Sequence, residues 1–255
     1  MPANRSNTMS SDGHSQLSKH EGSIDGLYND QAGYATYGVG HLVHKANKWP
    51  SFLLAAAQAN EKWASKTGKK YGNVQYLRRG SALADLSELE KAAVEEAKKI
   101  IAQTKYKKGY DELEAKVQEN VSGIARAAVK EEIRLLPRSA ENILTEDLRD
   151  YETAVNYVIT EVELLQEEYE ALVSLCFNIG VDAFANSQLA KKINDGQYRS
   201  GDLATRQRAI TAIENEFMNY TKTGKPPKEN ADLRKRRKAE ATLFLKAARE
   251  ELKSL

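Results

Sequence analysis

The only strand-like sequence in this chain is one stretch, residues 22–41, and most of the remainder has helical periodicity. That stretch reads GSIDGLYNDQAGYATYGVGH, in which aromatic and β-branched residues are separated by turn residues. It predicts two strands, Leu27–Asn29 and Tyr34–Tyr37, joined by a turn that is rich in Asn, Asp and Gly. A chain whose only sheet is one short hairpin must build most of its core from helices.

Apolar residues elsewhere recur at spacings of three and four, which is typical of amphipathic helices. Pro137 marks a helix boundary, and Gly180 is expected to stop the most apolar helix. The predicted helices lie near residues 17–21, 52–64, 86–100, 113–133, 148–165, 168–179 and 232–252.

Length and composition indicate a globular protein. The 255 residues suffice for one large domain or two modest ones, and 41% of them are hydrophobic and 29% charged. No apolar run approaches the roughly 18 residues of a membrane span, and the first residues contain no apolar segment of a secretory signal. Cys176 is the only cysteine, which excludes an internal disulfide and a cysteine-based zinc site. We expect an inert core thiol there.

Charge is unevenly distributed along the chain. Residues 1–80 carry a net charge of +5, residues 81–170 carry −9 and residues 171–255 carry +6. If the two basic parts meet in space, they form a cationic face that suits a polyanionic partner. Charge alone does not decide whether that partner is nucleic acid, anionic lipid or bacterial cell wall. The basic run 234–238 lies within an amphipathic helix. A solvated basic face, or a surface for the cell wall, is therefore favoured over a nucleic-acid site.

Two carboxylates lie on either side of the first predicted strand. Glu21 ends the first short helix, and Asp30 lies at the hairpin tip. Glycoside hydrolysis needs such a pair, one to protonate the leaving oxygen and one to activate water or attack directly. On spacing alone, a solvated glutamate and a turn-forming aspartate are the simpler interpretation. Thr36 alters this balance, because the hairpin returns its hydroxyl to the strand leading to Asp30, where both groups can hold one water.

Several separate motifs occur together in a fixed order. His20-Glu21-Gly22 is followed by Asp30, by Thr36 and by Gly38-Val39-Gly40-His41. Further along come ALVSLCFNIG at 171–180 and the pattern Arg236-Arg237-x-Ala239-Glu240-x-x-Leu243-Phe244. In this order and spacing the motifs resemble those of phage-type lysozymes, the endolysin or muramidase family. The resemblance covers residues 17–44 and 143–246, about half of the chain.

The resemblance implies a peptidoglycan muramidase, which hydrolyses the β-1,4 bond between N-acetylmuramic acid and N-acetylglucosamine. By position, Glu21 would be the general acid, and Asp30 and Thr36 would position the attacking water. In an inverting arrangement the two carboxyl groups stand about 6.5–9.5 Å apart. The implied substrate contacts are Tyr37, Gly38, Gly40 and Asn178, and the implied structural residues are His41, Arg236 and Arg237. No metal and no other cofactor is implied.

Residues 45–142 depart from the family pattern, which needs far fewer residues there. We expect a mostly helical insertion, interpreted as a stabilising lobe in preference to a partner or regulator site. The predicted organisation is a polar leader over 1–16, a lysozyme-like catalytic domain over 17–44 and 143–255, and an insertion over 45–142. The expected fold is mainly α, of the α+β lysozyme-like class, with a small lobe bearing a short antiparallel sheet and a larger helical lobe around a cleft.

Two alternatives to hydrolysis stay open, a lytic transglycosylase of the same fold and a non-catalytic cell-wall binding protein. The expected partner is peptidoglycan, with neither nucleic acid nor membrane insertion, and an immunity or inhibitor protein is a further candidate partner of an expected monomer. Without a signal peptide, the chain is expected to be made in the cytoplasm. A holin or a secretion machine would deliver it to the cell wall, as a viral lysis enzyme or as an antibacterial toxin.

Overall fold

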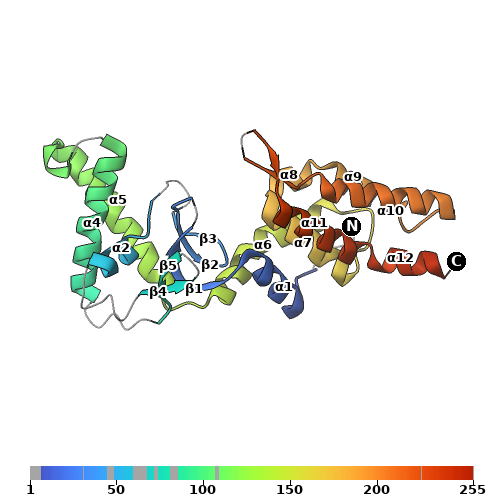
Figure 1. Ribbon diagram of the computed structural model, residues 1–255, viewed down its shortest axis with the longest axis horizontal. Coiled ribbons are helices and arrows are strands. Elements are labelled where there is room, and N and C mark those ends of the chain that lie inside the picture. Colours follow the sequence, from blue (N-terminus) through green and yellow to red (C-terminus); the bar gives the residue numbers. More distant parts are fainter. Residues whose placement is uncertain are drawn as a thin grey trace. The chain divides into compact units, whose positions relative to one another are not determined.

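The computed structural model describes residues 7–30, 32–44, 49–59, 68–71, 74–80, 86–106, 109–224 and 226–254. The chain divides into two compact units (Figure 1). Residues 21–144 form one, called the sheet unit here, and residues 1–20 with 145–255 form the other, called the helical unit. The predicted division into a catalytic domain and a 45–142 insertion follows different boundaries and stays a prediction.

A five-stranded antiparallel sheet is built from the described residues of the sheet unit. The predicted hairpin is confirmed as its first two strands. The strands occur in the spatial order β3-β2-β1-β5-β4, and their bounds are β1 Ile24–Asn29, β2 Ala35–Gly38, β3 His41–Leu42, β4 Gly68–Tyr71 and β5 Val74–Arg78.

Strands β4 and β5 contradict the expectation that residues 22–41 hold the only strand-like sequence. Strand β5 pairs with β1, so that Leu27 lies opposite Leu77. Gly26 permits this approach, because a Cβ atom at that position would lie 2.1 Å from the carbonyl oxygen of Leu77. Pairing with β1, which the local sequence does not predict, therefore places β5 in the sheet, and β4 pairs with β5.

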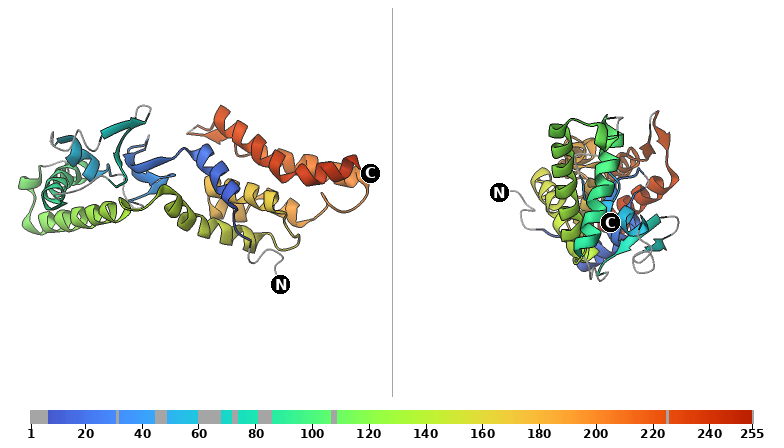
Figure 2. Two further views of the ribbon diagram at one scale, coloured as in Figure 1. Left: turned by 90° about the horizontal axis from the view of Figure 1, so that it is seen from below. Right: turned by 90° about the vertical axis from the view of Figure 1, so that its left-hand side faces the viewer.

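Helices from the expected insertion share one hydrophobic core with the sheet. They are α2 Phe52–Ala59, α4 Leu86–Tyr106, the 3₁₀ turn η1 Tyr110–Glu112 and α5 Ala115–Leu135. Figure 2 shows α4 and α5 running beside each other. Leu27 and Tyr37 from the sheet belong to the same buried cluster as Leu53, Ala97 and Val129 from these helices. The described parts of 45–142 therefore complete the hairpin's own core. The predicted helix over 52–64 is confirmed through Ala59, and residues 60–64 lie outside the described residues.

A buried carboxylate joins α5 to the start of α2. Glu132 is fully buried and accepts the backbone N–H groups of Phe52 and Leu53 at 2.9 Å each. These are the donors that the first turn of a helix leaves unpaired. The His44 ring nitrogen lies 3.4 Å from the same carboxylate, and its ring contacts Phe52. Glu132 thus holds the first turn of α2 and contacts His44.

The helical unit is assembled around an aromatic cluster. Phe244 lies at the centre, with ring centroids 5.6 Å from Tyr198 and 5.8 Å from Phe217. Helices α7 and α11 pack side by side, and α10 packs on α11 (Figure 1). Two helices cross the boundary of the units: α1 Ser11–Glu21, whose last residue belongs to the sheet unit, and α6 Ala140–Val158, whose first five residues do. The other elements are α7 Gln166–Ile179, α8 Val181–Ala185, α9 Gln188–Asn194, α10 Leu203–Met218, the two-stranded ribbon β6 Lys222–Thr223 and β7 Lys228–Glu229, α11 Ala231–Phe244 and α12 Lys246–Lys253. No helix in the described part of the chain has the length and apolarity that crossing a membrane requires.

The first helix begins earlier than predicted. It starts at Ser11, within the stretch expected to be a polar leader. The Ser10 backbone N–H and hydroxyl both donate to Glu170 of α7, at 3.0 and 2.5 Å, and Met9 is buried. Long-range contacts to α7 therefore order a segment whose local sequence is polar.

The helix predicted over 148–165 is wrong in its second half, because α6 ends at Val158. The side chain of Asn194 replaces the next helical hydrogen bonds. Its amide oxygen accepts the N–H groups of Thr160 and Glu161 at 2.9 and 3.1 Å, and its amide nitrogen donates to the Val158 carbonyl at 2.8 Å. The last predicted helix is also divided, at Leu245, into α11 and α12. Gly180 does end α7, with a φ of 88°.

Cys176 lies within α7, fully buried. Burial raises the pKa of its thiol to about 12, so the reactive thiolate is scarce at neutral pH. We expect no labelling of the native protein by a thiol reagent at pH 8, and one label per chain after unfolding in guanidinium. Because the folded state holds this proton to higher pH than the unfolded state, the thiol's contribution to stability is complete below pH 9 and is lost as pH rises toward 12. Rapid labelling of the folded protein would contradict the assignment.

Candidate active site

Asp30 builds the turn between β1 and β2 with its own carboxylate. Its Oδ1 accepts the backbone N–H groups of Ala32 and Tyr34, at 2.9 and 2.8 Å. Its backbone N–H donates to the Tyr34 carbonyl at 2.9 Å, which closes the turn. The second carboxylate oxygen takes part in none of these bonds. Asp30 is therefore held rigidly while an acceptor atom is left for another group.

Thr36 is attached to the same turn residue from the other side. Its hydroxyl donates to the carbonyl oxygen of Tyr34 at 3.1 Å, and the side chain is almost fully buried. The backbone of Tyr34 therefore binds Asp30 through its N–H and Thr36 through its carbonyl oxygen. Because the hydroxyl proton is engaged, the lone pairs of the Thr36 oxygen are available as acceptors.

Tyr28 lies within electrostatic reach of both predicted catalytic carboxylates. It lies opposite Thr36 in the β1–β2 register, and its hydroxyl forms a hydrogen bond with the backbone of Gly40. Burial raises the pKa of Tyr28, the Gly40 bond lowers it, and the charges of Asp30 and Glu21 raise it further. Glu21, the half-buried last residue of α1, therefore acts on the same phenol as Asp30.

Tyr28 is absent from the site predicted by sequence. A signal was present, because residues two apart in a strand share a face and Tyr28 precedes Asp30 by two. Its position directly opposite Thr36 in the predicted hairpin is the second signal. Strand alternation applied to the predicted register would have identified it.

The structure does not bring the side chain of Tyr37 to this group. Tyr37 is fully buried, and its hydroxyl donates to the Arg138 carbonyl at 2.7 Å. Burial raises the pKa of that hydroxyl to about 12. Gly38 is also turned inward, where a Cβ atom would lie 3.0 Å from the Cβ of Ala140. Gly40 is exposed, and a Cβ atom there would have no neighbour within 4 Å.

His41, expected to be structural, lies in β3 near α5. A hydrogen bond from Arg134 holds the pKa of Glu131 in α5 below its usual range, and the charges of His41 and His44 contribute in the same direction. His41 therefore lies within electrostatic reach of α5.

The other predicted residues belong to the helical unit. Arg237 is fully buried and donates to the amide oxygen of Asn178 at 2.9 Å. Arg236 donates from Nε to Glu240 at 3.0 Å and from its terminal nitrogen to the Ser174 carbonyl at 3.1 Å. These bonds join α11 to α7, the two segments that carry the motifs of this unit.

Comparison with known proteins identifies relatives of this chain. A sequence model of the family described as phage lysozyme matches residues 104–240. The endolysin of Acyrthosiphon pisum secondary endosymbiont phage 1 is 40% identical over 107 residues, which are 41% of this chain and 64% of that protein. The endolysin of Salmonella phage P22 is 35% identical over 106 residues, 42% of this chain and 62% of that protein. The chain thus spans less than two thirds of the length of these two endolysins.

A solved structure shows the same fold. The endolysin from Escherichia coli O157:H7 phage FAHEc1 superimposes with a TM-score of 0.50 and 19% identity, over 94% of this chain and 95% of that one. The expected fold class, mainly helical with a small antiparallel sheet, is confirmed. The family match includes Asn178 and the Arg236-Arg237 pair. It begins at residue 104 and so does not include the hairpin that carries Asp30 and Thr36. Because it covers more than half of the sequence, the chain belongs to the phage lysozyme family.

Proposed function

We propose that this protein is a peptidoglycan hydrolase of the muramidase type. It would cleave the β-1,4 bond between N-acetylmuramic acid and N-acetylglucosamine without a metal or other cofactor. The observation that carries the proposal is the shared attachment of Asp30 and Thr36 to Tyr34, beside a phenol that senses both Asp30 and Glu21. The names of the endolysin relatives support the same substrate class.

The proposed reaction needs two different carboxyl groups. Glu21, protonated, gives its proton to the leaving glycosidic oxygen. The free oxygen of Asp30 and the lone pairs of Thr36 accept the two hydrogens of one water, which directs the water's own lone pair toward the sugar. Asp30 then takes the proton that the water releases on attack. This is the inverting arrangement, in which the water is placed between the base and the sugar.

A lytic transglycosylase is the first alternative. That reaction closes the sugar on its own hydroxyl and consumes no water, so two acceptors arranged for a water would have no use. A non-catalytic cell-wall binding protein is the second. It would have no need for an aspartate whose carboxylate is fixed by two N–H groups with one oxygen left over. Hydrolysis uses both features.

The remaining assignments are proposals of narrower scope. We keep Gly40 and Asn178 as substrate contacts, because Tyr37 is fully buried and Gly38 faces Ala140. His41, Arg236 and Arg237 are proposed as structural residues. The protein would act as a monomer on the cell wall, delivered by a holin or a secretion machine, with an inhibitor or immunity protein as a candidate partner.

Mass spectrometry of fragments released from purified sacculi tests the reaction. Hydrolysis predicts soluble muropeptides that end in a reducing N-acetylmuramic acid. Ends carrying 1,6-anhydro sugars would assign transglycosylation in its place. Release of no fragments by folded protein would support the non-catalytic alternative.

The role of Thr36 is tested by Thr36→Val, which keeps the side-chain shape and removes the acceptor. We expect the turnover rate on sacculi to fall by about 10- to 100-fold, because one of the two acceptors for the water is lost. Thr36→Ser retains a hydroxyl and is the matched control, expected to keep most of the activity. Equal rates for the valine and serine variants would remove Thr36 from the mechanism.

A further inference from the structure

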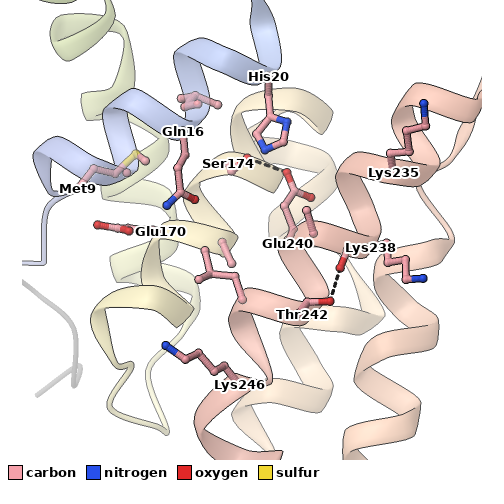
Figure 3. A pocket seen from close by; sticks show the side chains of 15 residues that line it. Met9, Gln16, His20, Glu170, Ser174, Lys235, Lys238, Glu240, Thr242 and Lys246 are labelled. Atoms are coloured by element: carbon pink, nitrogen blue, oxygen red, sulfur yellow. Dashed lines mark hydrogen bonds between the residues drawn. The ribbon is translucent and has the colours of Figure 1, made fainter.

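The helical unit contains a cavity that the proposed reaction does not use. It has a volume of about 560 Å³ and lies between α1, α7 and α11 (Figure 3). Its walls include Met9 and Leu17 from the α1 side, Ala171 from α7, and Ala239 and Leu243 from α11. Small-molecule sites usually enclose about 300–1,000 Å³ and are mainly apolar. The size and lining of this cavity fall within that description.

The cavity has cationic groups at one edge. Lys235 and Lys238 of α11 line it, and Figure 3 shows both on the right of the view, with His20 of α1 at the top. Lys246 of α12 lines the lower left and lies 3.8 Å from Glu167. Lys238 forms no ion pair with any described residue, and Lys235 only approaches Asp232, at 3.8 Å, where both groups are largely exposed. The basic run noted in the sequence is thus divided, since Arg236 and Arg237 are buried and these two lysines border the cavity.

Two carboxylates in the wall are already engaged by the protein. Glu240 is buried, with Arg236 and Arg237 at 3.0 and 3.1 Å. Glu170 accepts hydrogen bonds from Ser10 and from the Gln166 amide. The donors to Glu170 are neutral, so it keeps a negative charge on the α7 wall, while Lys235 and Lys238 make the α11 edge positive.

We propose that this cavity binds a free single-chain anionic amphiphile of the fatty-acid class. The alkyl chain would cover Leu17, Ala239 and Leu243, and the carboxylate would lie at Lys235 and Lys238. Burying the chain removes apolar wall and apolar ligand surface from water together, which favours binding. The lysines then select an anionic head over a cationic one. This site is independent of the proposed glycosidase chemistry.

Isothermal titration calorimetry of the full chain with dodecanoate, kept below its micelle concentration, tests the proposal. We expect saturable binding of one molecule per chain, and binding of dodecyltrimethylammonium weaker by about tenfold or more. Absence of saturable dodecanoate binding would overturn the proposal. So would equal affinity for the cationic amphiphile. Binding to phosphatidylglycerol vesicles without binding of free dodecanoate would assign a membrane surface and also overturn it.

Two variants locate the ligand. Ala239→Trp fills the cavity from an exposed helical position, and we expect it to weaken dodecanoate binding by about tenfold or more. The pair Lys235→Gln and Lys238→Gln should weaken it by about threefold, in line with exposed ion pairs. The matched control, Lys191→Gln with Lys253→Gln, removes the same charge from exposed helical sites away from the cavity and should leave affinity unchanged. Thermal unfolding verifies each fold. Unaltered affinity in Ala239→Trp, or equal loss in the control, would contradict the assignment.

Discussion

Glu21→Gln is expected to reduce cell-wall lysis by about 10²- to 10⁴-fold, the usual contribution of a general acid. Glutamine has nearly the same shape and cannot give a proton to the leaving oxygen. Glu21 is the half-buried last residue of α1, so the substitution should leave the fold intact. The measurement is the rate at which a turbid suspension of purified walls clears, with thermal unfolding of both proteins as the check on structure.

Glu119→Gln is the matched control for this variant. Glu119 is exposed on α5 in the same unit, and its substitution makes the identical chemical change. It should clear the suspension at the parental rate. If Glu21→Gln also clears it at that rate while folded, the acid must be another residue, and the proposed mechanism fails at its first step.

The hairpin could be predicted because its signals are local. The residues that form the turn are themselves Asn, Asp and Gly, and Asp30 makes the turn's hydrogen bonds with its own side chain. Strand alternation could have been used further. Thr36 and Tyr37 are adjacent in β2, so their side chains must leave opposite faces of the sheet. Only one of them can belong to the site, and Tyr37 is the one in the core.

The missed elements depend on partners far away in the sequence. Strand β5 has one fully buried residue, Leu77, and reads locally as a weak strand. Its position follows from pairing with β1 across Gly26. Helix α6 likewise ends where Asn194, 36 residues beyond Val158, captures its backbone. The helical spacing of apolar residues continues through Val162 and Leu165, so it predicts a longer helix. No residue near them in the sequence indicates that Asn194 takes over the hydrogen bonds there.

The family motifs identified charged residues that a hydrophobic pattern alone would place on the solvent-exposed face of the helix. The run at 234–238 has the composition of a solvated basic face. Two of its members, Arg236 and Arg237, are buried, because Glu240 lies one helical turn later and forms ion pairs with both. Burial of a charged group follows from its partner, and the partner is visible in sequence only as the spacing Arg-Arg-x-Ala-Glu.

That shared carboxylate gives the second large effect. Glu240 is 4% exposed, and Arg236 and Arg237 are 6% and 0% exposed. The Ser174 hydroxyl also donates to Glu240, at 2.6 Å. Glu240→Ala removes the acceptor of the Ser174 and Arg236 hydrogen bonds and the partner of both ion pairs, and it leaves two guanidinium charges in the interior. Breaking a buried pair in this way costs about 3–5 kcal/mol, and we expect the free energy of unfolding in urea to fall by that amount.

Three further variants make this measurement specific: Glu250→Ala, Arg237→Met, and Arg237→Met combined with Glu240→Ala. Glu250→Ala, at an exposed position on α12, should alter the free energy of unfolding by less than about 0.5 kcal/mol. The double variant should lose less free energy of unfolding than the sum of the losses in the two single variants. Glu240→Ala alone leaves the Arg237 charge without its carboxylate, and Arg237→Met removes that charge. Strict additivity, or a Glu240→Ala protein as stable as Glu250→Ala, would mean that the buried ion pairs within α11 do not stabilise the helical unit. The predicted structural role of Arg237 would then have to rest on its bond to Asn178 alone.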